Sequence, residues 1–186
     1  KAEDADALTR KYMDELQQTM DTLQPEQHYV EPQPEEPPAG AASRAETGVA
    51  LETLRELNAA LVRLPDGFAI HRKLERVREK RPVILDKEDE RTVDWAAAEE
   101  LAFASILAEG TSIRLTGEDV ERGTFSHRHA VLHDVKTGEK FVPLRQFPTG
   151  RARFDVFNSP LSEMGVLGFE YGYSLDVPDG LTIWEA

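Results

Sequence analysis

The sequence contains no cysteine, fewer basic than acidic residues (22 against 35), and no long apolar run. Without cysteine, the chain cannot form a disulfide, a thiolate metal site or a cysteine nucleophile. This fits a reducing compartment, and we expect a cytoplasmic protein. The net charge of −13 argues against a nucleic-acid partner, because phosphate binding needs a basic surface. No apolar run approaches the roughly 20 residues of a membrane span, so we expect no membrane partner.

The residues that are present have the composition of an ordinary folded protein, 40% hydrophobic and 31% charged over 186 residues. The acidic N-terminal residues lack the apolar core of a signal peptide. The chain starts inside a helical pattern and stops in a predicted strand. We therefore expect a fragment of a longer polypeptide.

The first 92 residues predict helices and an acidic, proline-rich segment. Apolar residues recur at helical spacing over Glu3–Leu23 and Leu51–Leu64, and His71–Lys80 predicts a short basic helix. Pro25–Ala42 contains five prolines, so we expect an extended conformation there. The predicted divisions are 1–44, the N-terminal helix with its Pro-rich linker, and 45–92, a helical linker.

Residues 93–186 predict an α/β domain. Asp94 is a suitable N-cap for an apolar helix that ends at Gly110. Strands and helices are expected to alternate over these residues, which predicts a mostly parallel sheet with flanking helices. The expected elements are strands at Ile113–Leu115, Arg153–Phe157 and Thr182–Trp184, a helix from Glu163, and a hairpin over Val135–Leu144 around Thr137 and Gly138.

The first candidate site is the segment FSHRHAVLHD, at Phe125–Asp134. If this segment is extended, His127, His129 and His133 face one way and Arg128 faces the other. Three imidazoles on one side could bind a divalent metal ion. They could also act as acid, base or anion-binding groups, or be ordinary loop histidines.

The second candidate site is NSPLSEMGVLGFEYGYS, at Asn158–Ser174. Glu163 begins a predicted helix where a strand ends, a place where α/β proteins often bind ligands. A first-turn glutamate is also favoured by the helix dipole without any such role. Glu170, seven residues later, should point to about the same side. Because a glycine inside a helix costs ~0.8–1 kcal/mol relative to alanine, we expect another backbone or a flat ligand to approach the face formed by Gly165, Gly168 and Gly172.

Three segments together resemble the thiamine-diphosphate-dependent decarboxylating component of 2-oxoglutarate dehydrogenases. They occur in the family's order: RGTFSHRHAVLHD at Arg122–Asp134, NSPLSE followed by GFEYGYS, and LTIWEA at Leu181–Ala186. The resemblance runs from about Leu64 to the last residue. It implies a transketolase-like pyrimidine-binding fold over 93–186, thiamine diphosphate as the cofactor, and a homodimer.

The resemblance also implies roles for individual residues. Glu163 matches the glutamate that hydrogen-bonds a nitrogen of the aminopyrimidine ring, and Leu161 matches an apolar residue that braces the cofactor beside it. His127 and His129 match histidines that bind substrate or move protons, and Arg128 could neutralise a substrate carboxylate. Glu170, the competing candidate, is expected to reach a structural partner or a neighbouring subunit.

The implied reaction is the decarboxylation of 2-oxoglutarate, followed by transfer of the succinyl unit to the lipoyl domain of a partner dihydrolipoyl succinyltransferase. The sequence has no Gly-Asp-Gly motif with a downstream asparagine, so we expect magnesium and the diphosphate to be held by residues outside it. We therefore expect the 186 residues alone to be inactive. The alternatives are a related thiamine-dependent 2-oxo acid decarboxylase or carboligase, and a non-catalytic α/β assembly module.

Overall fold

The computed structural model describes residues 2–22, 38–40, 43, 45–87 and 90–185. The chain divides into two compact units, Lys1–Glu46 and Thr47–Ala186. The first unit contains helix α1 (Ala2–Thr22), which confirms the helix predicted over Glu3–Leu23. Apolar side chains along α1 are exposed, among them Leu16 and Met20. The Pro-rich segment Pro25–Ala42 falls almost entirely outside the described residues.

The second unit begins with helices that precede the sheet. They are α3 (Leu51–Leu61), α4 (Arg72–Arg78), the short 3-10 helix η1 (Arg81–Val83) and α5 (Trp95–Ala108). The helices α3 and α4 are both shorter than predicted. The residues 45–92, predicted as a linker, therefore pack in the same unit as 93–186, apart from the first two.

Helix α5 begins as the sequence predicts. The Asp94 carboxylate caps the helix by accepting a hydrogen bond from the Ala97 N–H at 2.8 Å. Trp95 is 92% exposed, whereas Phe103 and Leu107 are buried. Because the helix is apolar on nearly every side, its sequence pattern does not determine which side packs.

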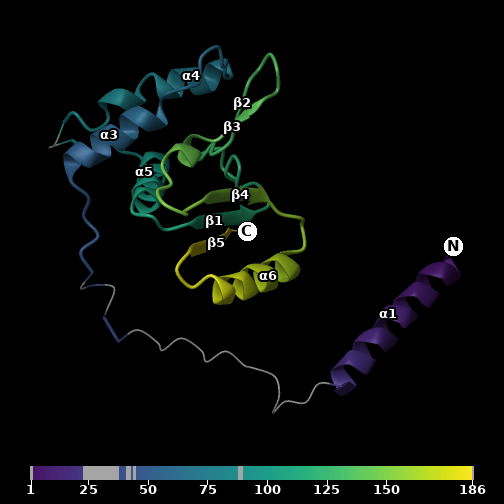
Figure 1. Ribbon diagram of the computed structural model, residues 1–186. Coiled ribbons are helices and arrows are strands. Elements are labelled where there is room, and N and C mark those ends of the chain that lie inside the picture. Colours follow the sequence, from purple (N-terminus) through teal and green to yellow (C-terminus); the bar gives the residue numbers. More distant parts are fainter. Residues whose placement is uncertain (1, 23–37, 41–42, 44, 88–89, 186) are drawn as a thin grey trace. The chain divides into compact units, whose positions relative to one another are not determined.

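The sheet has three parallel strands, as predicted. The central strand β1 (Ile113–Gly117) pairs with β4 (Phe154–Asn158) on one side and β5 (Leu181–Glu185) on the other. The register aligns Gly117 with Asn158 and with Glu185. These three residues end their strands side by side, and we call this the carboxyl edge of the sheet (Figure 1).

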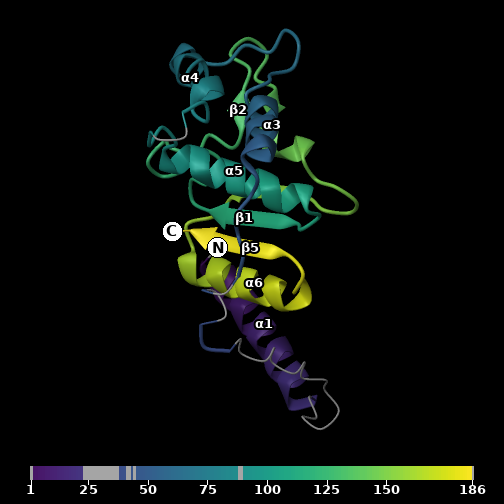
Figure 2. The ribbon, with the colours of Figure 1, turned by 90° about the vertical axis from the view of Figure 1, so that its left-hand side faces the viewer.

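Helices lie on both sides of the sheet (Figure 2). Alternate strand residues such as Ile113 and Phe154 pack against α5 in the buried core, which α3 extends. The opposite face carries Arg114, which pairs with a residue of helix α6 (Glu163–Asp176). None of the helices in the described part of the chain is both long and apolar enough to cross a membrane.

A small hairpin stands apart from this sheet. Its strands β2 (Leu132–His133) and β3 (Lys140–Phe141) are antiparallel, and the 3-10 helix η2 (Pro143–Gln146) follows. The predicted turn around Gly138 is confirmed, with φ of 76° at this residue. The first strand, however, begins before the predicted Val135.

The Asp134 carboxylate fastens this hairpin to the preceding helical region. It accepts hydrogen bonds from the backbone N–H groups of Ala69 and Lys136, both at 2.7 Å, and of Thr137 at 2.9 Å. These hydrogen bonds favour the charged form and lower the pKa of Asp134 to about 2.

We expect Asp134→Asn to destabilise the chain at neutral pH and to have little effect near pH 2. The folded-state pKa of about 2 lies below the unfolded value of about 3.9, so the ionised group stabilises the fold above pH 4. That stabilisation is lost as the pH falls from about 4 to about 2. Urea unfolding across this range measures it, with the exposed Asp179→Asn as control. A difference between Asp134→Asn and wild type that does not change with pH would contradict the assignment.

Candidate functional site

Both candidate segments leave the sheet at the carboxyl edge. The histidine loop, residues 118–131, follows β1, and the turn that contains Pro160 follows β4. The Ser159 N–H donates to the Gly117 carbonyl at 2.7 Å, and the Glu121 N–H donates to Asn158 Oδ1 at 3.0 Å. The structure thus ties together residues that lie 37 or more positions apart in the sequence.

Glu163 is the first residue of α6 and its side chain is exposed. Within the described residues it makes no ion pair, so its carboxylate remains available. Leu161, two residues earlier, is 80% exposed. Both predicted cofactor residues therefore lie on an open surface at the start of α6.

A groove of about 380 Å³ runs beside this helix start. Ser162 and Gly165, the neighbours of Glu163 in the first turn, line it, and Phe157 and Phe169 give it an aromatic wall. The Thr116 hydroxyl is buried in the groove and has no hydrogen-bond partner within the described residues. Such an unpaired buried hydroxyl is uncommon in folded proteins.

Glu170 binds a structural partner within its own chain. This is one of the two alternatives predicted for it, the other being a neighbouring subunit. Its side chain is 4% exposed, and Oε2 and Oε1 accept hydrogen bonds from Arg114 Nε at 2.7 Å and Nη2 at 2.9 Å. The guanidinium carbon also lies 4.7 Å from the centre of the Tyr173 ring, in a cation–π contact. This pair joins α6 to the central strand.

The glycine face of α6 is open. A Cβ added at Gly168 or Gly172 would meet nothing within 4 Å, so no backbone of the described chain approaches there. A Cβ at Gly165 would lie 3.1 Å from the Ser162 hydroxyl, at the groove. The expectation of a flat ligand at this face stays a prediction.

Residues 125–131 of the histidine segment do not form a strand, and only Leu132–His133 do, so the predicted alternation of its side chains is wrong. Ser126 and His129 have positive φ values of 54° and 47°, which reverse the chain direction. The N–H groups of Arg128 and His129 both donate to the Arg122 carbonyl, at 3.0 and 2.9 Å. The segment is therefore a closed loop held by its own backbone.

His127 packs tightly inside this loop. A Cβ added at Gly123 would lie 2.5 Å from the Cε1 atom of the His127 ring, so only glycine allows this packing. His127 Nδ1 is buried without a hydrogen-bond partner in the described residues. The loop therefore encloses this edge of the ring.

His129 is half-buried in the same loop. Burial lowers its pKa below the ordinary value, and the nearby charges of Arg122 and His127 lower it further against an opposing hydrogen bond with the Ser126 backbone. His129 is therefore neutral at pH 7 and can accept a proton. His133 lies outside the loop on β2 and is exposed. No group of three or more His, Cys, Asp or Glu side chains in the described residues could hold a metal ion, so the alternative three-histidine metal site does not form.

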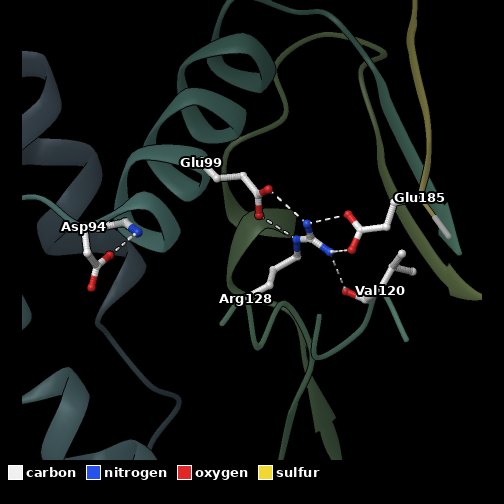
Figure 3. A network of polar contacts seen from close by, with 6 residues as sticks. Asp94, Glu99, Val120, Arg128 and Glu185 are labelled. Carbon is white, nitrogen blue, oxygen red and sulfur yellow. Dashed lines mark hydrogen bonds and ion pairs between the residues drawn. The ribbon is translucent and has the colours of Figure 1, made fainter. Parts of the chain in front are cut away.

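Arg128 is buried between two carboxylates of its own chain (Figure 3). It donates to Glu99 from Nε at 2.6 Å and from Nη2 at 2.9 Å, and to Glu185 from Nη1 at 3.0 Å and from Nη2 at 2.7 Å. Burial opposes its charge, but the hydrogen bonds to both carboxylates outweigh burial and raise the pKa of Arg128. Its role in neutralising a substrate carboxylate stays a prediction, and that role would require a carboxylate to move away.

Comparison with known proteins identifies the part of the chain that contains these features. Residues 91–186 match the family described as "Transketolase, pyrimidine binding domain". The chain belongs to this family. The match covers the parallel sheet, the histidine loop and the start of α6, as the sequence predicts.

The chain is also similar to three proteins called "2-oxoglutarate dehydrogenase E1 component", from Staphylococcus aureus strains JH9, Newman and JH1. Each is 57% identical over 141 residues, or 76% of this chain. The chain spans only 15% of the length of these relatives. The match extends beyond the pyrimidine-binding domain into the preceding residues.

Sequence reasoning missed three charged residues that hold this pyrimidine-binding domain together. They are Arg114, Glu99 and Glu185, whose partners lie far away in the chain. The available signal was their position: Arg114 is charged inside a strand, and Glu99 lies beside Glu100 in a mostly apolar helix. Charges in such positions are rarely buried without a partner.

We expect Arg114→Met to destabilise the pyrimidine-binding domain by about 3 kcal/mol, because it leaves the buried Glu170 carboxylate unpaired. The double variant Arg114→Met/Glu170→Leu should recover part of this loss by removing the unpaired charge. Urea unfolding at pH 7 measures both, and Arg151→Met, at an exposed turn, provides the control. If Arg114→Met is as stable as wild type, the pair of Arg114 and Glu170 contributes little to the free energy of unfolding.

Proposed function

We propose that this chain is part of a 2-oxoglutarate dehydrogenase that uses thiamine diphosphate, and that it supplies the pyrimidine-binding half of the active site. The observation that supports this most is the carboxyl edge, where Glu163 and the histidine loop follow neighbouring parallel strands. Ligands of open α/β sheets bind at such edges. The 57% identity to proteins called 2-oxoglutarate dehydrogenase E1 component favours this substrate over other 2-oxo acids.

The groove beside α6 fits the flat aminopyrimidine ring of thiamine diphosphate. Its volume of about 380 Å³ is in the range of small-molecule sites, and Phe157, Val166 and Phe169 line it. Thr116, whose buried hydroxyl has no partner in the described residues, also lines the groove. Glu163 and Leu161 are exposed and do not line the groove themselves, but they are sequence neighbours of Pro160 and Ser162, which do.

When bound, thiamine diphosphate would supply the carbon nucleophile and the electron sink that decarboxylation requires. Glu163 would hold a hydrogen bond at a nitrogen of the pyrimidine ring, sharing a proton through its carboxylate oxygen. Its place at the first residue of α6 anchors the backbone beneath this carboxylate. Leu161 would brace the ring from the same turn.

His127 and His129 would bind 2-oxoglutarate or transfer protons at its reacting carbon. His129 suits proton transfer because burial keeps its pKa low and its imidazole neutral at pH 7. His127 is half-buried in the same loop, and we place the substrate contact on this residue as the resemblance implies. Neither role needs a metal ion at the histidines.

The proposal includes features that depend on residues outside this chain. Magnesium and the diphosphate group would be held elsewhere in the enzyme, and the complete site would form in a homodimer. The succinyl unit would pass to the lipoyl domain of dihydrolipoyl succinyltransferase in the tricarboxylic acid cycle. The cytoplasmic location stays a prediction of the same proposal.

We expect Glu163→Ala to lower the turnover of 2-oxoglutarate by at least about 100-fold in the full-length enzyme, because a positioned proton-sharing group typically contributes 10²–10⁴-fold. Its melting temperature should stay within about 2 °C of wild type, since the side chain is exposed. Steady-state decarboxylation assays and thermal unfolding measure the two effects.

Glu52→Ala is the matched control, because Glu52 is also an exposed glutamate in the first turn of a helix. It should leave turnover unchanged. If Glu163→Ala also keeps near-normal turnover, the chain is better described as a non-catalytic assembly module.

We also expect the isolated 186-residue chain to be inactive. It supplies only the pyrimidine-binding half of the proposed site, so binding of the diphosphate group should fail. The test is release of carbon dioxide from 2-oxoglutarate with added thiamine diphosphate and magnesium. Measurable turnover by this chain would refute the idea of a half-site.

A further inference from the structure

We propose that Arg128 is a positioning residue that fixes the histidine loop to α5 and β5 and thereby sets the placement of His127 and His129. The proposal rests on the function proposed above. It assigns Arg128 an indirect role in the reaction, in place of the substrate contact expected from the sequence.

The hydrogen bonds of Arg128 leave no donor for a substrate. A guanidinium has five N–H groups. Four are used by Glu99 and Glu185, and the fifth is directed from Nη1 to the Val120 carbonyl at 3.4 Å. The Arg128 side chain is 5% exposed, so a substrate could reach it only by displacing one of these partners.

The position of Arg128 in the chain explains how it can act on both histidines. It lies between His127 and His129 in the sequence, so its anchored side chain constrains the backbone on both sides. Ser126 and His129 have positive φ values, a conformation that non-glycine residues keep only where the surroundings enforce it. The two ion pairs supply such a constraint.

The two carboxylates come from separate elements and approach the guanidinium from opposite sides (Figure 3). Glu99 belongs to α5 and Glu185 to the carboxyl end of β5. Bidentate pairing to both requires the planar fork of arginine, which a lysine ammonium cannot reproduce. The test variant should therefore keep the positive charge at this position and remove the bidentate hydrogen bonds.

The experiment compares wild type, Arg128→Lys and Glu185→Gln in the full-length enzyme with thiamine diphosphate and magnesium. For Arg128→Lys we expect kcat to fall by about 10- to 100-fold while KM changes less than about threefold, because misplaced catalytic groups mainly affect the transition state. Glu185→Gln should act in the same direction. The double variant should lose no more than Arg128→Lys alone, since both changes break one contact.

Hydrogen–deuterium exchange provides a readout that does not depend on turnover. The N–H groups of Arg128, His129 and Val131 are hydrogen-bonded within the loop, to Arg122 and Glu121. In both single variants we expect these amides to exchange at least about tenfold faster, with β4 unchanged.

Arg81→Lys is the matched control. Arg81 also pairs with a glutamate of α5, Glu100 at 2.9 Å, but it joins the helices that precede the sheet instead of the histidine loop. It should lower the melting temperature while leaving kcat and the exchange of the loop amides near wild type.

Two results would overturn the proposal. One is a rise in KM without a fall in kcat for Arg128→Lys, with Glu185→Gln unaffected, which would indicate that Arg128 binds substrate directly. The other is unchanged exchange of the loop amides in both variants. If wild type itself fails to decarboxylate 2-oxoglutarate, the proposed function fails, and the exchange experiment still decides whether Arg128 holds the loop.

Discussion

The backbone at Gly117 leaves no room for a side chain. A Cβ there would lie 2.1 Å from the Glu185 carbonyl oxygen and 2.7 Å from Val120 Cγ1. Its own carbonyl also accepts the hydrogen bond from Ser159 that begins the turn toward α6. The ends of three strands thus converge on one glycine, and this close approach brings the histidine loop and the start of α6 to the same edge of the sheet. A larger residue would separate the parts of the candidate site.

Helix α5 holds this edge through charge as well as apolar packing. Its adjacent glutamates serve different parts of the fold: Glu99 binds Arg128 of the histidine loop, while Glu100 binds Arg81 of the preceding helices. Burial raises the pKa of Glu100, and the charges of Arg81 and Arg78 oppose this rise. Helix α5 therefore connects the predicted linker to the histidine loop, which explains why both belong to one compact unit.

The sequence predicted the elements better than the contacts between them. The Asp94 cap and the apolar segment that ends at Gly110 identified α5, and the alternation of strands and helices identified the parallel sheet, because both signals are local. The histidine loop was misread, because non-glycine residues at positive φ carry no sequence signal. The pair between Arg114 and Glu170, separated by 56 positions, depends on tertiary packing that periodicity cannot show. The candidate residue Glu163 was reached through resemblance to a family.

The carboxylates around the site fall into two groups that explain why Glu163 is the candidate. Glu170 and Glu99 are each paired with an arginine. Separating either carboxylate from its arginine would leave a charge without a partner inside the fold. Glu163 has no such partner in the described chain, and it lies between Leu161 and Met164, which are 80% and 87% exposed. Large apolar side chains grouped at a surface indicate a binding region. A carboxylate without an ion-pair partner within an apolar surface is complementary to a ligand with a flat ring and a basic nitrogen. The carboxylate would bind the nitrogen, and the apolar side chains would contact the ring.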